Sequence, residues 1–259
     1  MDKDDFIFIC EKALLKTSRF FGYELRPIIK QELSPIDVFS LAVRDLMSRQ
    51  PEIFFLQIGA HDGLSFDPIG PFIRKHHWKG LLVEPQQKMF AKLVENYADE
   101  KQLLFENSAI AEQDGTLTLY GIAGVPAEDM ASMAPSFRRH YITLNGAGLH
   151  GKIEATEVPA LTLDSLLKKH RIDRVDLLQI DTEGYDFRII KMIDFSRIKP
   201  QIIHFESNYL NHAQMGECSR LLHAQGYSLL TLGVDTIAYL QPEDESSAQR
   251  MKSSKVVFT

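Results

Sequence analysis

Short apolar runs alternate with amphipathic stretches of helix length from residue 53 to about residue 232. Such runs, bounded by turn residues, are typical of buried strands, and they predict strands at 53–58, 80–84, 103–107, 175–180, 201–206 and 226–232. Apolar positions with the helical period predict helices at about 68–77, 86–97, 162–171, 185–193 and 212–224. Strands and helices in this alternation predict an α/β fold around a mostly parallel sheet.

Four segments depart from this alternation. Residues 1–50 carry apolar positions every three or four residues, which predicts a helical N-terminal extension before a main domain at 51–259. A turn at Asp114-Gly115 predicts an extra strand at 115–120, and residues 231–236 predict a hairpin that makes the last strand pair antiparallel. Residues 121–157 contain glycine and proline without a clean period, and we interpret them as a lid-like insertion.

Composition and charge exclude several classes of protein. The chain has 29 basic and 35 acidic residues, so its net charge of -6 provides no overall positive field for binding a nucleic acid. Its two cysteines are too few for a disulfide scaffold and favour a reducing compartment. The acidic first residues do not resemble a secretory signal, and no apolar run approaches the roughly 20 residues of a membrane span. We therefore expect a cytoplasmic protein.

Polar and glycine residues follow the first three predicted strands. Gly59 and Gly63 follow the first strand, where glycine allows a sharp turn and the close approach of a ligand, although their spacing does not match the dinucleotide pattern G-x-G-x-x-G. The second strand ends in Glu84, whose carboxylate can accept protons from both hydroxyls of a ribose or can cap the following helix. Residues 107–109 follow the third strand, where they can meet the edge of an adenine. Together these residues favour a nucleoside site.

Carboxylates gather after two later strands. The strand at 175–180 runs into Asp181, Glu183 and Asp186, and the strand at 201–206 ends in Glu206. Because ligands of open α/β sheets bind beyond the carboxyl ends of the strands, we expect these carboxylates to face the same site as the nucleoside. His204 shares a strand face with Glu206. The alternatives are helix capping for the acids and a hydrogen-bonded core position for the histidine.

A set of segments carries a resemblance to a known family. These segments are Gln57-Ile-Gly-Ala-His-Asp-Gly63, Leu82-Val-Glu-Pro85, Asn107-Ser-Ala-Ile110, Leu161-Thr-Leu-Asp164, Leu178-Gln-Ile-Asp-Thr-Glu-Gly-Tyr-Asp186 and Ile203-His-Phe-Glu206. Over roughly residues 50–240 the chain resembles the FkbM-type family of S-adenosylmethionine-dependent methyltransferases. The resemblance implies the class I methyltransferase fold, a Rossmann-like sheet of seven strands in which the last is antiparallel.

The resemblance also implies where the cofactor S-adenosylmethionine binds. Gly59 and Gly63 would pass beneath its methionine part, and Glu84 would hold its ribose. One position departs from the family pattern, because Gln57 stands where a strand-end acid is usual. A glutamine oxygen can still accept a hydrogen bond from the cofactor ammonium, but it contributes no charge.

The same resemblance implies the remaining contacts and the reaction. Ser108 and Ala109 would border the adenine, and Asp181 would lie where the methyl group is transferred. Family members methylate oxygen on small molecules or sugars, so the expected acceptor is a hydroxyl group. The acceptor itself cannot be read from the sequence.

Transfer to a hydroxyl requires a general base within hydrogen-bond reach. We expect Asp181 to be the first candidate and Glu206 the second, followed by His204 or by His140 and His150 of the insertion. Asp181 and Glu206 also leave open a route assisted by Mg²⁺, although their spacing does not demand a metal.

Other functions remain open at this point. The glycine spacing and the Asp-Thr-Glu-Gly segment disfavour a nicotinamide-dependent dehydrogenase. A non-catalytic S-adenosylmethionine-binding protein and an interaction protein on the same fold are harder to exclude. A homo-oligomer is a further open alternative.

Overall fold

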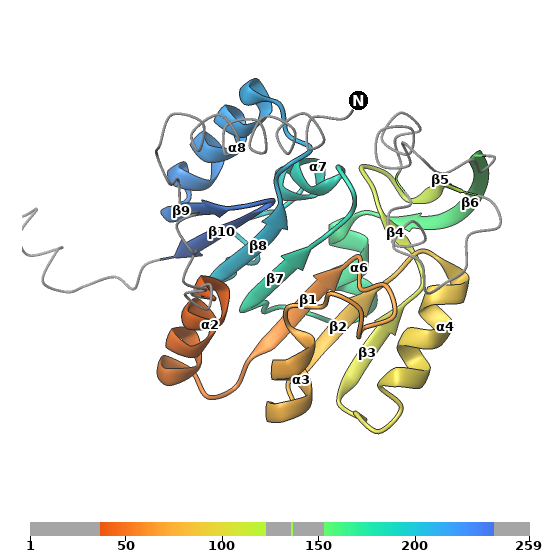
Figure 1. Ribbon diagram of the computed structural model, residues 1–259, viewed down its shortest axis with the longest axis horizontal. Helices are drawn as coiled ribbons and strands as arrows, with labels where there is room; N and C mark the ends of the chain where they lie inside the picture. The colour runs from red at the N-terminus through yellow and green to blue at the C-terminus, as the bar shows by residue number, and fades with distance from the viewer. Residues whose placement is uncertain (1–36, 123–135, 137–152, 241–259) are drawn as a thin grey trace, which may run out of the picture. The chain divides into compact units, whose positions relative to one another are not determined.

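The computed structural model describes residues 37–122, 136 and 153–240 (Figure 1). The described elements, in chain order, are α2 (Val38–Arg49), β1 (Phe54–Ile58), α3 (Gly70–His76), β2 (Lys79–Val83), α4 (Gln87–Asn96), β3 (Leu103–Glu106), β4 (Ala109–Ile110), β5 (Gly115–Ile122), β6 (Ile153–Leu161), α6 (Leu163–Lys169), β7 (Leu177–Ile180), α7 (Asp186–Lys191), β8 (Ile202–Glu206), α8 (His212–Ala224), β9 (Tyr227–Leu232) and β10 (Asp235–Leu240). The predicted strands and helices of the main domain are confirmed, and none of their ends shifts by more than two residues.

Seven strands form the main sheet in the order β3-β2-β1-β7-β8-β10-β9. Strands β1, β2, β3, β7 and β8 pair in parallel, whereas β10 runs antiparallel to both β8 and β9. This arrangement confirms the predicted class I methyltransferase fold and the terminal hairpin. The order changes direction between β1 and β7, and the carboxyl ends on either side of such a switch point form the usual ligand-binding edge of an α/β sheet.

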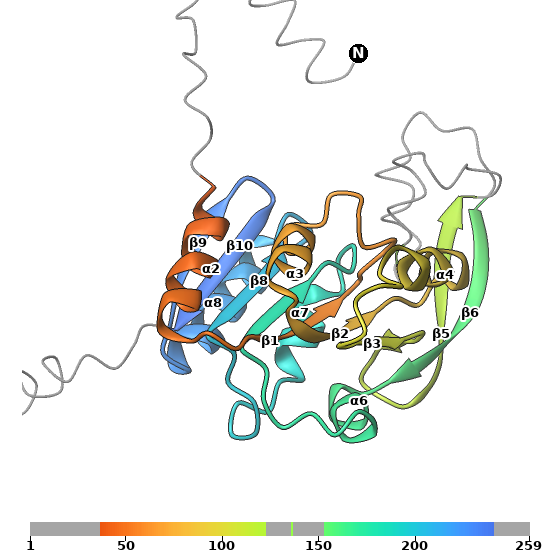
Figure 2. The same cartoon turned by 90° about the horizontal axis from the view of Figure 1, so that it is seen from below.

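Helices cover both faces of the main sheet. The central strands β1, β7 and β8 are therefore buried on both sides. On one face, Leu56 and Ile58 of β1 belong to an apolar cluster with buried residues of α6, α7 and α8. On the other face, Phe55 contacts Trp78, which stacks on Phe72 of α3 with ring centroids 5.5 Å apart. Figure 2 shows α3 and α4 on one side of the strands and α6 on the other.

Side-chain caps fix the starts of two helices near the sheet. The Thr162 side chain accepts a hydrogen bond from the backbone N–H of Ser165 at the start of α6. At the start of α8, Asn211 and Gln214 form a capping box in which each side chain accepts from the backbone N–H of the other. Such caps satisfy N–H groups that have no partner inside the helix.

A second sheet of three strands was not predicted. Its order is β4-β6-β5, and β5 pairs with β6 antiparallel over eight positions, from Gly115↔Ala160 to Ile122↔Ile153. The expected extra strand at 115–120 is therefore present and extends to Ile122. Strand β6 escaped prediction because it contains Pro159 and is mostly exposed, with only Val158 and Ala160 buried.

The lid-like insertion predicted at 121–157 needs a correction at both ends. Its first two residues belong to β5 and its residues 153–157 belong to β6, so the stretch between the strands is shorter than the sequence indicates. Apart from Ser136, the rest of the insertion lies outside the described residues, as does the N-terminal extension before residue 37. Within the described part of the chain, no helix has the length and apolar character needed to cross a membrane.

Candidate functional site

Gly59 joins the end of β1 to the loop after β7. Its φ of +87° lies in the left-handed region, and a Cβ built on it would lie 1.7 Å from the carbonyl oxygen of Asp181. The two segments approach this closely because β1 and β7 are neighbouring strands, and the backbone N–H of Asp181 donates to the carbonyl of Ile58 at 2.9 Å. Only glycine fits at position 59. The glycine turn therefore brings the first strand's loop against the carboxylate segment.

Gly63 is required by packing against α4. Its φ is +69°, and a Cβ at this position would lie 2.4 Å from Tyr97 Cε2 and 2.6 Å from Leu93 Cδ1. Both side chains are buried. The loop after β1 is thus packed between α4 and the edge of the sheet where the carboxyl ends of the strands lie.

Glu84 lies at the end of β2 with its side chain buried. One carboxyl oxygen accepts from the backbone N–H of His61 at 2.9 Å, and the other accepts from the backbone N–H of Gln86 at 2.8 Å. Burial outweighs these hydrogen bonds and raises the pKa of Glu84 to about 7. Gln86 is the N-cap residue of α4 and makes no side-chain capping hydrogen bond itself, so the Glu84 carboxylate lies beside the start of that helix. Each carboxyl oxygen retains a second lone pair, with which the group can also accept from a hydroxyl.

Gln57 is buried two residues before Gly59. Its side-chain N–H donates to Oδ1 of Asp67 at 3.2 Å, whereas its Oε1 is buried without a hydrogen-bond partner among the described residues. A buried acceptor without a donor is costly, which marks this oxygen as a position for a donor from a ligand. Asp67 was not predicted as part of the site, because its contact depends on how the loop after β1 folds back.

The segment after β3 lies beside the end of β2. The Asn107 side chain donates to the backbone carbonyl of Glu84 at 2.7 Å and thereby ties the two strand ends together. Ser108 is 1% exposed, and its hydroxyl has no partner within the described residues. Ala109 is also buried, at the start of β4. The predicted adenine-bordering residues thus adjoin the predicted ribose-binding glutamate.

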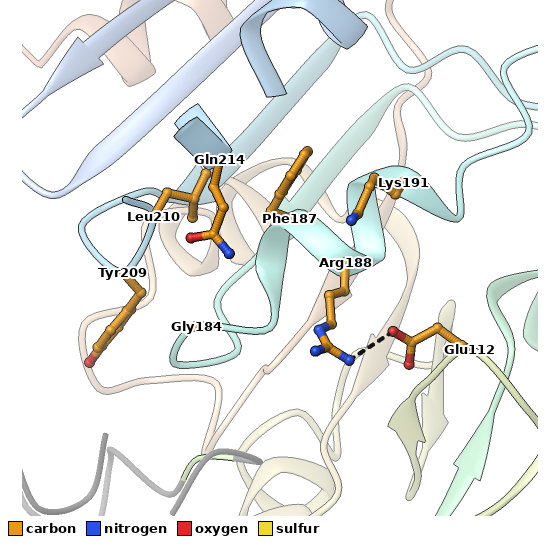
Figure 3. A pocket seen from close by; sticks show the side chains of 8 residues that line it. All are labelled: Glu112, Gly184, Phe187, Arg188, Lys191, Tyr209, Leu210 and Gln214. Carbon is orange, nitrogen blue, oxygen red and sulfur yellow. Dashed lines mark hydrogen bonds and ion pairs between the residues drawn. The ribbon is translucent and has the colours of Figure 1, made fainter. Parts of the chain in front are cut away.

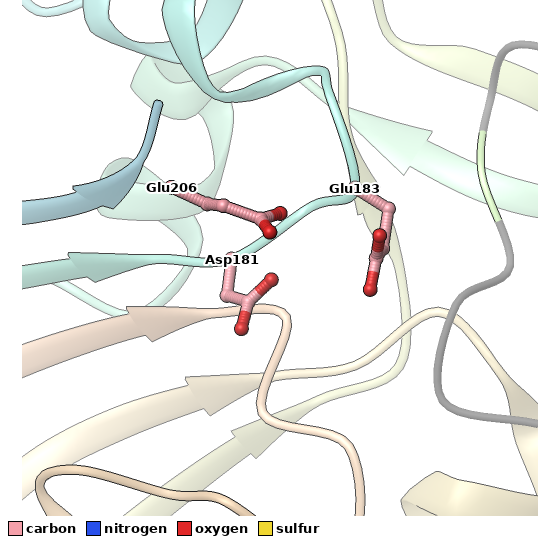
Figure 4. Close-up of side chains that lie close together, drawn as sticks. All are labelled: Asp181, Glu183 and Glu206. Atoms are coloured by element: carbon pink, nitrogen blue, oxygen red, sulfur yellow. The ribbon is translucent and has the colours of Figure 1, made fainter. Parts of the chain in front are cut away.

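Three carboxylates converge beyond the ends of β7 and β8 (Figure 4). Oxygen atoms of Asp181, Glu183 and Glu206 all lie within 4.8 Å of one another, although the sequence separates them by up to 25 positions. We call these three residues the acidic cluster. Glu183 and Glu206 are half-buried, and Asp181 keeps an exposed surface although surrounding protein atoms desolvate its carboxyl group.

The acidic cluster holds protons more tightly than ordinary carboxyl groups do. Burial, followed by repulsion from Asp181 and Glu183, raises the pKa of Glu206 to about 9. Desolvation and then the charges of Asp186 and Glu183 raise the pKa of Asp181 well above its usual range. Like charges this close cannot all ionise at low cost, so neutralisation by protons or by a cation would stabilise the cluster. Carboxylate oxygens are also the ligands that Mg²⁺ prefers.

Two contacts from distant parts of the chain support Glu183. The Tyr209 hydroxyl donates to the Glu183 carboxylate, and the Ser136 hydroxyl donates to the Glu183 backbone carbonyl at 2.8 Å. Glu183 itself has a φ of +52°, an uncommon backbone conformation for a residue other than glycine. Neither contact was predicted, because Tyr209 lies in a turn and Ser136 forms an isolated β-bridge with Tyr120, so neither belongs to a periodic element. Ser136, a described residue within the range predicted as an insertion, thus contacts the backbone of one residue of the acidic cluster.

Asp186 and His204 have well-defined structural partners. The Asp186 carboxylate accepts from the Thr182 hydroxyl at 2.9 Å and from the backbone N–H of Gly184 at 3.2 Å, which shapes the loop before α7. His204 is buried, and its Nδ1 lies 2.6 Å from the side-chain oxygen of Gln179 on β7. It lies two residues before Glu206 on the same strand face, one step below the acidic cluster. His140 and His150 lie outside the described residues.

One protein family matches most of the chain. Residues 57–229, more than half of the chain, match the model of the "Methyltransferase FkbM domain" family. No curated protein matches the chain.

The chain is also similar to solved structures of several methyltransferases. A methyltransferase FkbM from Methylobacillus flagellatus KT is 14% identical with a TM-score of 0.46; the match covers 73% of this chain and 43% of that one. A putative caffeoyl-CoA O-methyltransferase from Staphylococcus aureus is 10% identical with a TM-score of 0.43, over 89% of this chain and 91% of that one. A ribosomal protein L11 methylase from Lactobacillus delbrueckii subsp. bulgaricus is also 10% identical, with a TM-score of 0.39 over 86% and 91% of the two chains.

Proposed function

The chain belongs to the FkbM methyltransferase family, and we propose that it transfers the methyl group of S-adenosylmethionine to a hydroxyl oxygen of a sugar or another small molecule. The acidic cluster is the observation that supports oxygen as the atom that accepts the methyl group. A hydroxyl must lose its proton during transfer, and three carboxylates beside the glycine turn provide bases for it.

The residues around β1 and β2 fit the cofactor. The unpartnered Oε1 of Gln57 can accept from an ammonium group, and the Glu84 carboxylate can accept from ribose hydroxyls. The close approach at Gly59 leaves backbone rather than a side chain facing the ligand. S-adenosylmethionine supplies an electrophilic methyl group on a positively charged sulfonium. These contacts would orient it toward Asp181.

The acidic cluster would accept the hydroxyl proton. A carboxylate with a raised pKa is a stronger base than an ordinary one, provided that it is ionised when the acceptor binds. The positively charged sulfonium of the bound cofactor would lower the pKa of a carboxyl group beside it, so that the group ionises more readily. We therefore assign the general base to Asp181 or Glu206, and we assign to His204 and Gln179 the role of holding the strand face beneath it.

A route assisted by Mg²⁺ uses the same three side chains. A divalent cation bound by Asp181, Glu183 and Glu206 would lower the pKa of the acceptor hydroxyl and orient it. Turnover measured after chelation and again after addition of Mg²⁺ separates the routes. Loss and recovery of turnover supports the cation, and unchanged turnover supports direct proton transfer to a carboxylate.

Cofactor binding is the first experiment. Isothermal titration with S-adenosylmethionine should show binding to the full chain, and Glu84→Gln should weaken it about tenfold or more, because a hydrogen bond to a charged group is lost. Glu95→Gln, an exposed glutamate on α4, is the matched control and should bind like the unchanged protein. Absence of binding to the unchanged protein would refute the proposal.

Turnover distinguishes an enzyme from a non-catalytic cofactor-binding protein. Sugars and hydroxylated small molecules are screened by the formation of S-adenosylhomocysteine. Asp181→Asn and Glu206→Gln should retain cofactor binding and lower turnover, since each replaces a carboxylate with a neutral group of similar size. Cofactor binding without turnover of any hydroxyl compound would instead favour the non-catalytic alternative.

A further inference from the structure

A cavity adjoins the acidic cluster on the side of α7 and α8 (Figure 3). Its volume is about 170 Å³, and its lining includes Phe187, Arg188 and Lys191 from α7 and Gln214 from α8. Pockets that enclose a whole small-molecule ligand usually measure roughly 300–1,000 Å³. This cavity is therefore suited to one substituent of a larger molecule.

Donor groups dominate the polar lining of the cavity. Arg188 and Lys191 are three residues apart on α7, a spacing that places both cations on one side of the helix. Lys191 makes no ion pair with any carboxylate in the described part of the chain, and its ammonium lies 4.7 Å from the centre of the Phe187 ring. Gln214 approaches from α8, where its side-chain oxygen is engaged in the capping box and its amide N–H₂ remains a donor.

One carboxylate in the lining fixes the arginine without cancelling the positive charge. Glu112 accepts from Arg188 Nη1 at 3.1 Å and also from the Tyr185 hydroxyl. Arg188 and Lys191 together carry two positive charges against the single negative charge of Glu112. The cavity thus presents a net positive charge and several N–H donors, which is the chemistry that binds a carboxylate or a phosphate group.

The cavity and the acidic cluster share their walls. Gly184, which lines the cavity, directly follows Glu183, and Tyr209, another lining residue, donates to the Glu183 carboxylate. A molecule with its substituent in the cavity would therefore extend over Glu183. The two sites have opposite charge, so an anionic group is attracted to the cavity and repelled by the cluster.

We infer that this cavity binds an anionic substituent of the methyl acceptor, a carboxylate or phosphate group held by Lys191 and Arg188, while the acceptor hydroxyl lies at the acidic cluster. This inference rests on the proposed function and narrows its substrate class to hydroxyl compounds that carry a negative charge. Neutral sugars would lack the second contact and would be poor acceptors.

The test is an NMR-monitored titration of the full chain with inorganic phosphate and with acetate, and with glycerol as the neutral probe, at constant ionic strength. Phosphate or acetate should shift resonances of residues that line the cavity, whereas glycerol should not. Lys191→Met removes the charge but keeps most of the side-chain length and should weaken anion binding about tenfold or more. Lys191→Arg should restore it. Lys75→Met, an exposed lysine near the end of α3, is the matched control.

The two probes separate the two kinds of anion, because preference for phosphate indicates a phosphorylated acceptor and preference for acetate a carboxylated one. Equal anion binding by the unchanged protein and Lys191→Met, or shifts outside the cavity only, would overturn the inference. S-adenosylmethionine binding is measured on the same samples. Its presence without anion binding refutes the cavity assignment alone, and its absence refutes the proposed function alone.

Discussion

Replacement of Glu206 by glutamine should stabilise the folded chain while it impairs turnover. The structure raises the pKa of this carboxyl group from its ordinary value of 4.5 to about 9, chiefly through burial and then through the neighbouring charges of Asp181 and Glu183. One pKa unit corresponds to about 1.36 kcal/mol of difference between the two protonation states. The folded protein therefore disfavours ionisation of Glu206, whereas the unfolded chain allows it.

The direction in which stability changes with pH follows from the pKa of Glu206 in the unfolded chain and in the folded chain. Below about pH 4.5 the group is protonated in both states, so Glu206 and glutamine have similar effects on stability. Between about 4.5 and 9 the unfolded chain ionises and the folded chain does not, so the stability of the unchanged protein falls as pH rises. Glutamine removes this dependence.

The size of the effect at pH 7 can be bounded. The 2.5 units between pH 7 and the ordinary value of 4.5 correspond to about 3.4 kcal/mol for an isolated group. Partial exposure of Glu206 and protons shared within the acidic cluster reduce this figure, so we expect an increase of about 1–3 kcal/mol in the free energy of unfolding.

Chemical denaturation of both proteins at several pH values between 5 and 8 measures the effect. The difference between Glu206→Gln and the unchanged protein should grow with pH, whereas Glu95→Gln should show no such trend. A Glu206→Gln protein that is less stable by the same amount at every pH would refute the reasoning, because it would show that the carboxylate contributes ordinary hydrogen bonds. Increased stability combined with reduced turnover is the trade-off expected of a functional residue.

Two further changes test the framework that holds the site. Gly59→Ala should destabilise the fold by about 2–4 kcal/mol, because an alanine there has a strained left-handed backbone and overlaps with the Asp181 carbonyl. The same change should abolish cofactor binding. A stable variant that binds the cofactor would contradict the tight approach of the two loops. Asn211→Ala should cost about 1 kcal/mol in thermal or chemical unfolding through loss of the capping box with Gln214, and an unchanged midpoint would argue against that cap.

The pattern of the sequence was sufficient for the main sheet. Buried strands such as β1 and β7 are continuous apolar runs, and the intervening helices carry the helical period, so local composition and tertiary position agree. Strands β4 and β6 could not be predicted in this way. The first has only two residues, and the second is held mainly by backbone pairing with β5 despite Pro159 and exposed glutamates.

The candidate site shows the same division. The chain order of strands and acids determined that Glu84, Asp181 and Glu206 would meet at one edge of the sheet, because each follows a parallel strand whose carboxyl end lies there. Only the tertiary structure decided that Tyr209 and Ser136 support Glu183. Tyr209 lies in a turn and Ser136 in an isolated β-bridge to Tyr120, and such positions depend on long-range packing rather than on local periodicity.

The charges of the site also depend on the tertiary structure. The sequence specifies which side chains are acidic, but the raised pKa of Glu206 arises from burial and from neighbours that the fold brings within 4.8 Å. The cavity between α7 and α8 likewise exists only because two helices that are distant in sequence pack side by side. The sequence by itself therefore determined the family, the sheet and the reacting edge, whereas the fold decided the proton affinities and the second binding surface, since both depend on distances through space.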